Sequence, residues 1–327
     1  MAKNFKTKIT EMLGIEYPII SGGMQWLSRA ELVASVADAG GIGFMTAESF
    51  ETPEDLREEI KKIRTLTDKP FGVNLSMIPE LGPPERTLQF CDVVCEEGVK
   101  VVETAGRSPE PLMPKLKDSG VKVIHKLTSV RHAVTAQRLG VDAVTLIGFG
   151  SGGHIGNDNV ASFILLPKAV EALDIPVIAG GGISNGRGFL AALAMGAEAV
   201  LMGTAFMMTK ECPIHENIKD RLVETKETDT ALILTTIKNP LRCMKNKLAD
   251  ECLLVEEQGA SFEEIIKTVG GGKGQVAYNT GDPDAAPIAC GQVAGLIDNI
   301  KSVKEVMEDI ISEADVLLGR LNGLAAN

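Results

Sequence analysis

Three short segments of the chain combine glycine with side chains that could do chemistry. The segments are Gly152-Gly153-His154, Gly180-Gly181-Gly182 and Gly203-Thr204, and each follows a short apolar run. Glycine lets backbone N–H groups approach an anion, because no Cβ stands in the way. The second and third segments therefore predict a phosphate cradle, and His154 offers an acid–base or polarising group beside it.

The elements that must position these segments alternate between strand-like and helix-like patterns. Strands are expected at residues 17–21, 42–46, 71–76, 99–103, 121–126, 143–147, 177–179 and 199–202. The runs are apolar throughout, as in parallel strands that are buried on both faces. Eight such strands, each followed by a helical pattern, predict an α/β fold of the (β/α)8 TIM-barrel type. A doubly wound sheet is the main rival, but Gly22-Gly23-Met24-Gln25 after the first strand is not its glycine fingerprint.

A region near the C-terminus breaks this rhythm. Helical patterns are expected at residues 216–228, 231–237, 241–258 and 262–268. We therefore expect a helical insertion or lid at residues 213–300 over the barrel mouth, with residues 1–212 and 301–327 forming the barrel. The glycine run 270–274 lacks a preceding strand and a following Ser or Thr, so a mobile loop is favoured over a second phosphate loop.

Composition and charge exclude several classes of protein. The formal net charge is −11, which disfavours nucleic-acid and anionic-membrane surfaces. The polar N-terminus and the short apolar runs predict neither a signal peptide nor a membrane span, hence a cytoplasmic location. The six cysteines form no CxxC motif and no cluster with histidine, so no metal site is expected. We expect a small-molecule substrate and consider a homodimer possible.

The predicted strand ends favour chemistry that a cofactor carries. They supply small residues, amides and hydroxyls, together with Lys126, His125 and His154. Glu103 is the one carboxylate among them, which argues against glycosidase chemistry, and no Ser-His-Asp set stands out. A flavin mononucleotide (FMN) fits, because it has one phosphate and a flat ring beside which a lysine can stabilise negative charge.

Three segments resemble the nitronate monooxygenase (2-nitropropane dioxygenase) superfamily of FMN barrels. They are Gly22-Gly23-Met24-Gln25-Trp26, residues 66–74 and Gly152-Gly153-His154-Ile155-Gly156. That superfamily also holds FMN-dependent NADH:quinone reductases and flavin-type enoyl-ACP reductases. Residues 123–133, Glu103-Thr104-Ala105-Gly106 and Glu211-Cys212-Pro213-Ile214-His215 look most similar to the quinone reductase branch.

The resemblance implies a role for each candidate site residue. His154 would be the catalytic residue over the reactive face, and Tyr278 would lie near the opposite face. The residues implied to bind FMN are Gly23, Met24, Gln25, Ser76, Lys126, Gly153, Gly181, Gly182, Gly203 and Thr204. Each of several residues also has an alternative interpretation without a functional role. His154 would then be a structural loop residue, Lys126 a solvated lysine and Trp26 part of the loop packing, and His125 and His132 would be structural histidines.

The chain departs from the superfamily pattern at three positions. Gly150 stands where relatives carry Glu, Ile147 where the quinone reductase branch tends to have Asp, and Ala205 where Arg is frequent. A less polar pocket suits an apolar acceptor. We therefore expect an FMN-dependent oxidoreductase that uses NADH or NADPH to reduce a quinone-like acceptor. Nitronate oxidation with O₂, enoyl-thioester reduction and a non-catalytic flavin-binding protein are the alternatives.

Overall fold

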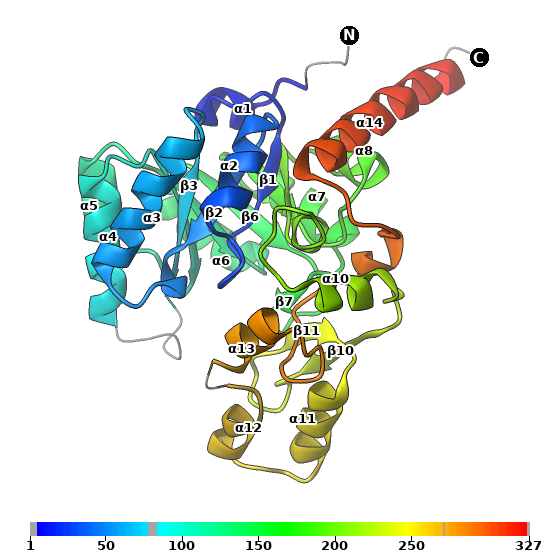
Figure 1. Ribbon diagram of the computed structural model, residues 1–327. Coiled ribbons are helices and arrows are strands. Elements are labelled where there is room, and N and C mark those ends of the chain that lie inside the picture. Colours follow the sequence, from blue (N-terminus) through cyan, green and yellow to red (C-terminus); the bar gives the residue numbers. More distant parts are fainter. Residues whose placement is uncertain (1–4, 78–83, 271, 326–327) are drawn as a thin grey trace.

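The computed structural model describes residues 5–77, 84–270 and 272–325. Eight parallel strands close into a barrel in the order β1-β2-β3-β4-β5-β6-β8-β9 (Figure 1). They are β1 (Ile19–Ser21), β2 (Ile42–Thr46), β3 (Gly72–Met77), β4 (Val101–Gly106), β5 (Lys122–Leu127), β6 (Ala143–Ile147), β8 (Val177–Gly180) and β9 (Ala199–Met202). The predicted TIM barrel is confirmed, and every predicted barrel strand overlaps an observed one.

A ring of helices covers the outside of the barrel. It comprises α2 (Ala30–Asp38), α3 (Pro53–Leu66), α4 (Pro84–Glu96), α5 (Met113–Asp118), α6 (Val130–Arg138), α7 (Ser162–Ala172), α8 (Gly186–Ala194) and α14 (Val303–Ala325). The C-terminal helix α14 packs against α8 and α2 and completes the ring. At the other end from the insertion, α1 (Lys8–Leu13) contributes Ile9 and Leu13 to the core inside the barrel.

The local sequence explains where these helices begin. Thr52 and Asp55 form a capping box at the start of α3, whose first residue is Pro53. Ser129 and Asn185 cap α6 and α8 through their side-chain oxygens. These caps hold the helices against strand ends that face the site.

The insertion contains two strands in addition to helices. Its elements are α10 (Glu216–Val223), β10 (Thr230–Ile233), β11 (Leu241–Met244), α11 (Lys247–Glu257), α12 (Phe262–Val269), α13 (Lys273–Thr280) and the short 3-10 helix η3 (Gln292–Leu296). The prediction of helix at 231–237 and at the start of 241–258 is wrong. β10 and β11 pair antiparallel, and β11 also pairs with β7 (Gly153–His154). For β11 these pairings override the local helix propensity, whereas β10 contains the β-branched residues Thr230 and Ile233.

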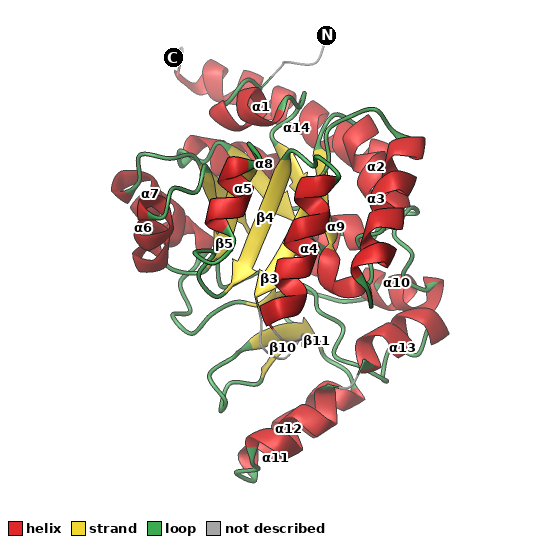
Figure 2. Cartoon of the chain, turned by 90° about the vertical axis from the view of Figure 1, so that its left-hand side faces the viewer, coloured by secondary structure: helices red, strands yellow, loops and turns green. Residues whose placement is uncertain are grey.

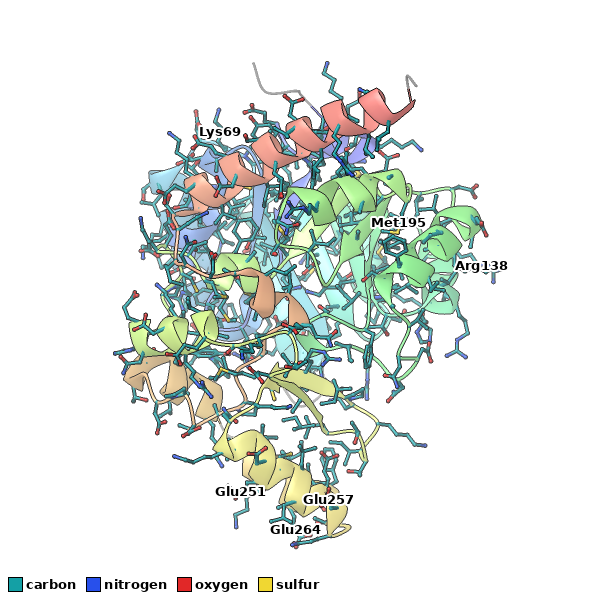
Figure 3. All side chains as sticks on the ribbon, turned by 90° about the vertical axis from the view of Figure 1, so that its right-hand side faces the viewer. Lys69, Arg138, Met195, Glu251, Glu257 and Glu264 are labelled. Carbon is teal, nitrogen blue, oxygen red and sulfur yellow. The ribbon has the colours of Figure 1, made fainter. Side chains whose placement is uncertain are left out.

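The insertion lies at the carboxyl ends of the barrel strands. Figure 2 shows β4 pointing toward the hairpin of β10 and β11, with α11 and α12 beyond it. The insertion has a small core of its own, which consists of Ile233, Leu234, Cys243, Ala249, Cys252 and Ile265. Glu251, Glu257 and Glu264 lie at its far end, away from the barrel (Figure 3).

All six cysteines are unpaired, and all except Cys95 are buried. Among the described helices, none combines the length and apolar character needed to cross a membrane. In the part of the chain that the structure describes, no cluster of His, Cys, Asp and Glu side chains has the makings of a metal site.

Candidate functional site

One large cavity lies between the barrel mouth and the insertion, and its volume is about 1450 Å³. Ligand pockets for one small molecule are typically about 300–1,000 Å³, so this cavity has room for a cofactor and a second molecule. All eleven site residues predicted from the sequence line it: Gly23, Met24, Gln25, Ser76, Lys126, Gly153, His154, Gly181, Gly182, Gly203 and Thr204. The structure thus brings the predicted residues together, while their individual roles stay predictions.

Glycines dominate the end of the cavity that β8 and β9 form. Gly181 and Gly182 have φ angles of +87° and +78°, so two successive N–H groups lie in a left-handed turn. Two such residues in succession suit an anion-binding concavity. A Cβ on Gly182 would meet no atom within 4 Å, and one on Gly203 would meet only the Met24 sulfur, at 3.7 Å. Side chains at these two positions would enter space that a phosphate needs.

Two other residues of this cradle also have structural contacts. A Cβ on Gly181 would come within 2.7 Å of the Ser151 Cβ, so glycine is required there for packing as well. The Thr204 hydroxyl accepts a hydrogen bond from the Gly291 N–H at 3.0 Å. Its own O–H proton can still be donated to a ligand.

The loop after β1 forms a closely packed floor. A Cβ on Gly23 would lie 2.7 Å from the Asn74 Cβ and 2.9 Å from the Thr46 hydroxyl oxygen. Trp26 has a left-handed φ of +64°, and its backbone N–H donates to the Ser49 hydroxyl at 2.7 Å. The Trp26 ring meets the Tyr278 ring edge-on, with centroids 6.5 Å apart. This contact joins the floor to α13 and supports the packing role considered for Trp26.

A buried polar network crosses the ends of β3, β4 and β5. The Lys126 ammonium and the Asn74 amide both donate to Oε2 of Glu103, at 2.8 and 2.6 Å. The Ser76 hydroxyl donates to Oδ1 of Asn74 at 2.8 Å. Lys126 is therefore held by a carboxylate rather than solvated, and its ammonium is fixed at the cavity wall.

Glu48 is a cavity residue that the sequence analysis missed. It follows β2 within the short 3-10 helix η1 (Ala47–Ser49), one residue beyond the predicted strand end at Thr46-Ala47. Its Oε1 accepts the Ser76 N–H at 2.7 Å, while its buried Oε2 has no hydrogen-bond partner. Burial raises the pKa of Glu48 to about 7. Extending each strand end by one more residue would have found it.

His154 extends from β7 into the cavity and is exposed. The other histidines have structural contacts: His125 pairs with the Thr104 hydroxyl at 2.9 Å, His132 with the Ser129 hydroxyl at 3.0 Å, and His215 caps α10. Burial lowers the pKa of His125 to about 4, so this ring is neutral at physiological pH. His125 and His132 also line the cavity, so the contact of His154 with a substrate stays a prediction.

The insertion contributes an apolar wall to the same cavity. The wall consists of Ile233, Leu234, Ile237, Leu241, Phe262, Ile266 and Val269. Two exposed cations, Arg107 from the end of β4 and Lys238 from the β10–β11 loop, also line the cavity. Neither forms an ion pair with a carboxylate in the part of the chain described. The combination suits a ligand with a long apolar portion and an anionic portion.

The chain has no charged side chain at the three positions where it departs from the superfamily pattern, Ile147, Gly150 and Ala205. Ile147 lines the cavity, and Ala205 is buried in the barrel core. The Gly150 carbonyl accepts the Gln292 N–H at 3.0 Å, which ties its loop to η3. Residues 78–83 and Gly271, which belongs to the glycine run 270–274, lie outside the described residues.

The donor set fits FMN. The open space at Gly182 and Gly203 suits one phosphate, and Ser76 and Lys126 offer a hydroxyl and a cation to a polar ring. The buried Thr46 hydroxyl beside Gly23 has no hydrogen-bond partner among the described protein atoms. A polar group at the floor that lacks a protein partner is consistent with a ligand there.

Comparison with known proteins identifies the family. The family model for nitronate monooxygenase matches residues 6–313. A Rhodococcus jostii "(3aS,4S,5R,7aS)-5-hydroxy-7a-methyl-1-oxo-octahydro-1H-indene-4-carboxyl-CoA dehydrogenase" is 32% identical, over 98% of this chain and 99% of its own length. A probable nitronate monooxygenase of Staphylococcus aureus is 31% identical, over 96% and 98%.

Solved structures agree with this assignment. FabK from Thermotoga maritima is 38% identical and superimposes with a TM-score of 0.90, covering 98% of this chain and 99% of its own. The chain belongs to the nitronate monooxygenase family and is a flavin-dependent oxidoreductase. The quinone-like acceptor expected from the sequence stays a prediction.

Proposed function

We propose that the protein reduces the carbon–carbon double bond of an enoyl thioester, with FMN as bound cofactor and NADH or NADPH as electron donor. The observation that carries this proposal is the apolar wall of the insertion, which lines the same cavity as His154. Apolar walls with a few convergent polar groups are typical of sites for acyl-type ligands. The carboxyl-CoA dehydrogenase from Rhodococcus supports a thioester, because its name describes a CoA ester.

The overall reaction would consume one NAD(P)H and one proton for each double bond that is saturated. When bound, the flavin supplies two-electron hydride chemistry between the nicotinamide and the acceptor. The insertion wall would hold the acyl chain and exclude water from it. Arg107 and Lys238 would attract the phosphates of a CoA ester or of the nicotinamide donor.

His154 would act on the acceptor. A hydrogen bond from its imidazole to the thioester carbonyl oxygen polarises the conjugated double bond and makes its β-carbon more electrophilic. Lys126 would stabilise negative charge on the bound ring from its fixed position beside Glu103. Lys126 lies on β5 and His154 on β7, and both line the cavity.

A quinone-like acceptor is the second candidate, because the same apolar cavity can take a flat ring. It makes less use of the long insertion wall and of the two cations. A small nitronate anion makes the least use of the apolar wall.

The test compares acceptors on one preparation with matched FMN content. We expect 2-enoyl-CoA esters to be reduced with a higher kcat/KM than a naphthoquinone or propionate 3-nitronate. Mass spectrometry should show the acyl product two hydrogen atoms heavier. If enoyl-CoA remains unreduced while the naphthoquinone is reduced, the quinone candidate replaces this proposal.

A further inference from the structure

Arg242 is a buried cation in the insertion. It lies on β11, only 4% of its surface is exposed, and its guanidinium stacks over the Phe149 ring at 4.7 Å from the centroid. Over the described residues it forms no ion pair with a carboxylate. Burying a charge without an opposite charge is costly, and an apolar side chain could fill this space instead. We therefore expect Arg242 to have a specific role that an apolar side chain could not fulfil.

The hydrogen bonds of Arg242 identify the loop on which it acts. Its Nε and Nη2 both donate to the Phe149 carbonyl, at 3.3 and 3.1 Å. Its Nη1 donates to the Thr230 hydroxyl on β10 at 2.9 Å. One planar guanidinium thus connects the hairpin of the insertion to the loop between β6 and β7.

That loop carries His154 and has little rigidity of its own. Residues 148–153 include four glycines, and Gly153 has a left-handed φ of +76°. Glycine gives a chain many accessible conformations, so outside contacts must select one. β11 supplies backbone contacts: Arg242 is opposite Gly153, Leu241 is opposite His154, and the Ile155 N–H donates to the Pro240 carbonyl at 3.2 Å.

We propose that Arg242 is a positioning residue that fixes the 148–153 loop and thereby places the His154 imidazole in the cavity. The consequence for the reaction rests on the proposed function, in which His154 polarises the acceptor. The insertion then does more than cover the barrel mouth, because it also sets the position of the catalytic side chain.

The first test follows the histidine directly and does not depend on the acceptor. The chain has four histidines, so ring 1H–15N signals of the FMN-loaded protein can be assigned with His154→Ala. In Arg242→Met the His154 signals should shift and broaden, while those of His125, His132 and His215 stay in place. Arg187→Met is the control, because Arg187 is a surface residue with 73% of its side chain exposed. Unchanged His154 signals in Arg242→Met would overturn the inference.

The second test uses kinetics. Misplacing a reacting group by about 1 Å can cost on the order of 100-fold in rate, so Arg242→Met should lower kcat by about 10- to 100-fold with little change in KM. Combining it with His154→Ala should give no further loss beyond His154→Ala alone, because residues that act as a unit are not additive. Multiplicative losses would contradict a role that acts through His154.

Two further variants separate geometry from charge and folding. Arg242→Lys should remain impaired, because an ammonium cannot reproduce the planar fork, and full activity in this variant would overturn the geometric account. If Arg242→Met does not fold, Thr230→Val removes one bond of the fork and should shift the His154 signals in the same direction. If His154→Ala keeps full activity, the proposed function fails, while the His154 signals still decide the role of Arg242.

Discussion

The barrel side and the insertion side of the cavity differ in the chemistry of their surfaces. On the barrel side, β3 to β5 present a buried polar network around Glu103, and the segments after β8 and β9 present Gly181, Gly182 and Gly203. On the insertion side, the hairpin and α12 present an apolar wall. Polar and glycine-rich surface suits a cofactor with a phosphate and a polar ring, whereas the apolar wall suits an acceptor. Under the proposed function, the barrel would hold the cofactor and the insertion would select what reacts with it.

The two sides also differ in the size of their hydrophobic cores. The barrel strands belong to large cores, whereas the insertion has a core of six residues and exposes Phe262 and Val276. Regions with few buried apolar contacts open locally at lower free-energy cost. We infer that the cofactor side is the more rigid one, and the following predictions test the division.

The largest effect is expected at the boundary between the two sides. His154→Ala should keep its FMN and lose turnover by on the order of 10² to 10⁴-fold, because a polarising group is removed. Stopped-flow absorbance of the flavin measures this loss, and FMN content per chain is the control. If His154→Ala turns over every accepted substrate at the wild-type rate, the role of His154 is structural only.

The next effect belongs to the barrel side. Gly203→Val should weaken FMN binding by about 100-fold, because its side chain would enter the space assigned to the phosphate and remove charge-assisted hydrogen bonds. Fluorescence titration of apoprotein with FMN measures the Kd. Gly319→Ala on α14 is the control, since a Cβ there also meets no atom within 4 Å but lies outside the cavity. Equal FMN affinity in the two variants would show that the segments after β8 and β9 do not bind the phosphate.

A pH effect on stability is expected from Glu48 on the barrel side. The unfolded chain releases the Glu48 proton near pH 4.5, whereas burial keeps it on the folded protein up to about pH 7. The free energy of unfolding should therefore fall as pH rises through this window, by on the order of 1–3 kcal/mol for this group.

Glu48→Gln should lack this contribution, because an amide keeps the bond to Ser76 and does not titrate. Urea unfolding of the apoprotein at pH 5 and pH 8 measures the difference. The two proteins should be about equally stable at pH 5, with the variant more stable at pH 8. Parallel pH profiles would show that the Glu48 carboxyl titrates normally.

The smallest effect belongs to the insertion wall. Phe262→Ser should lower kcat/KM about 10-fold for a long-chain enoyl-CoA and leave a four-carbon ester nearly unaffected, since only the long chain reaches the apolar wall. Leu254→Ser is the control, because Leu254 is similarly exposed on α11 but does not line the cavity. The same loss for both chain lengths would mean that the wall does not select the acyl chain.

The sequence predicted the barrel side far better than the insertion. Residues 42–46, 143–147 and 199–202 match the observed strands residue for residue, because fully buried parallel strands are short apolar runs that end at glycine or turn residues. Residues 241–258 are rich in helix-forming residues, which hides the strand β11, whereas four of the seven residues 231–237 are β-branched and favour the strand that was missed. β10 and β11 are strands because they pair with each other over four residues, and β11 also pairs with β7, nearly ninety positions earlier in the chain.

Side-chain partners were likewise beyond the sequence. Strand order brings Glu103 beside Lys126, since β4 and β5 are adjacent, and the analysis had placed both at strand ends. Glu48 needed the turn after β2, and Arg242 needed the contact between β11 and the loop before β7. These contacts depend on how distant segments pack, which local patterns do not encode.

The central claim is that the barrel holds a flavin reducible by NAD(P)H and that the insertion admits an enoyl thioester to it. The most direct measurement is anaerobic mixing of the FMN-loaded protein with NADH or NADPH, followed at the flavin absorbance band, and then addition of a long-chain 2-enoyl-CoA. The account predicts rapid bleaching by at least one nucleotide and rapid return of the oxidised spectrum when the thioester is added. A spectrum that neither nucleotide bleaches, or that stays bleached with the thioester and returns only with a quinone or O₂, would contradict it.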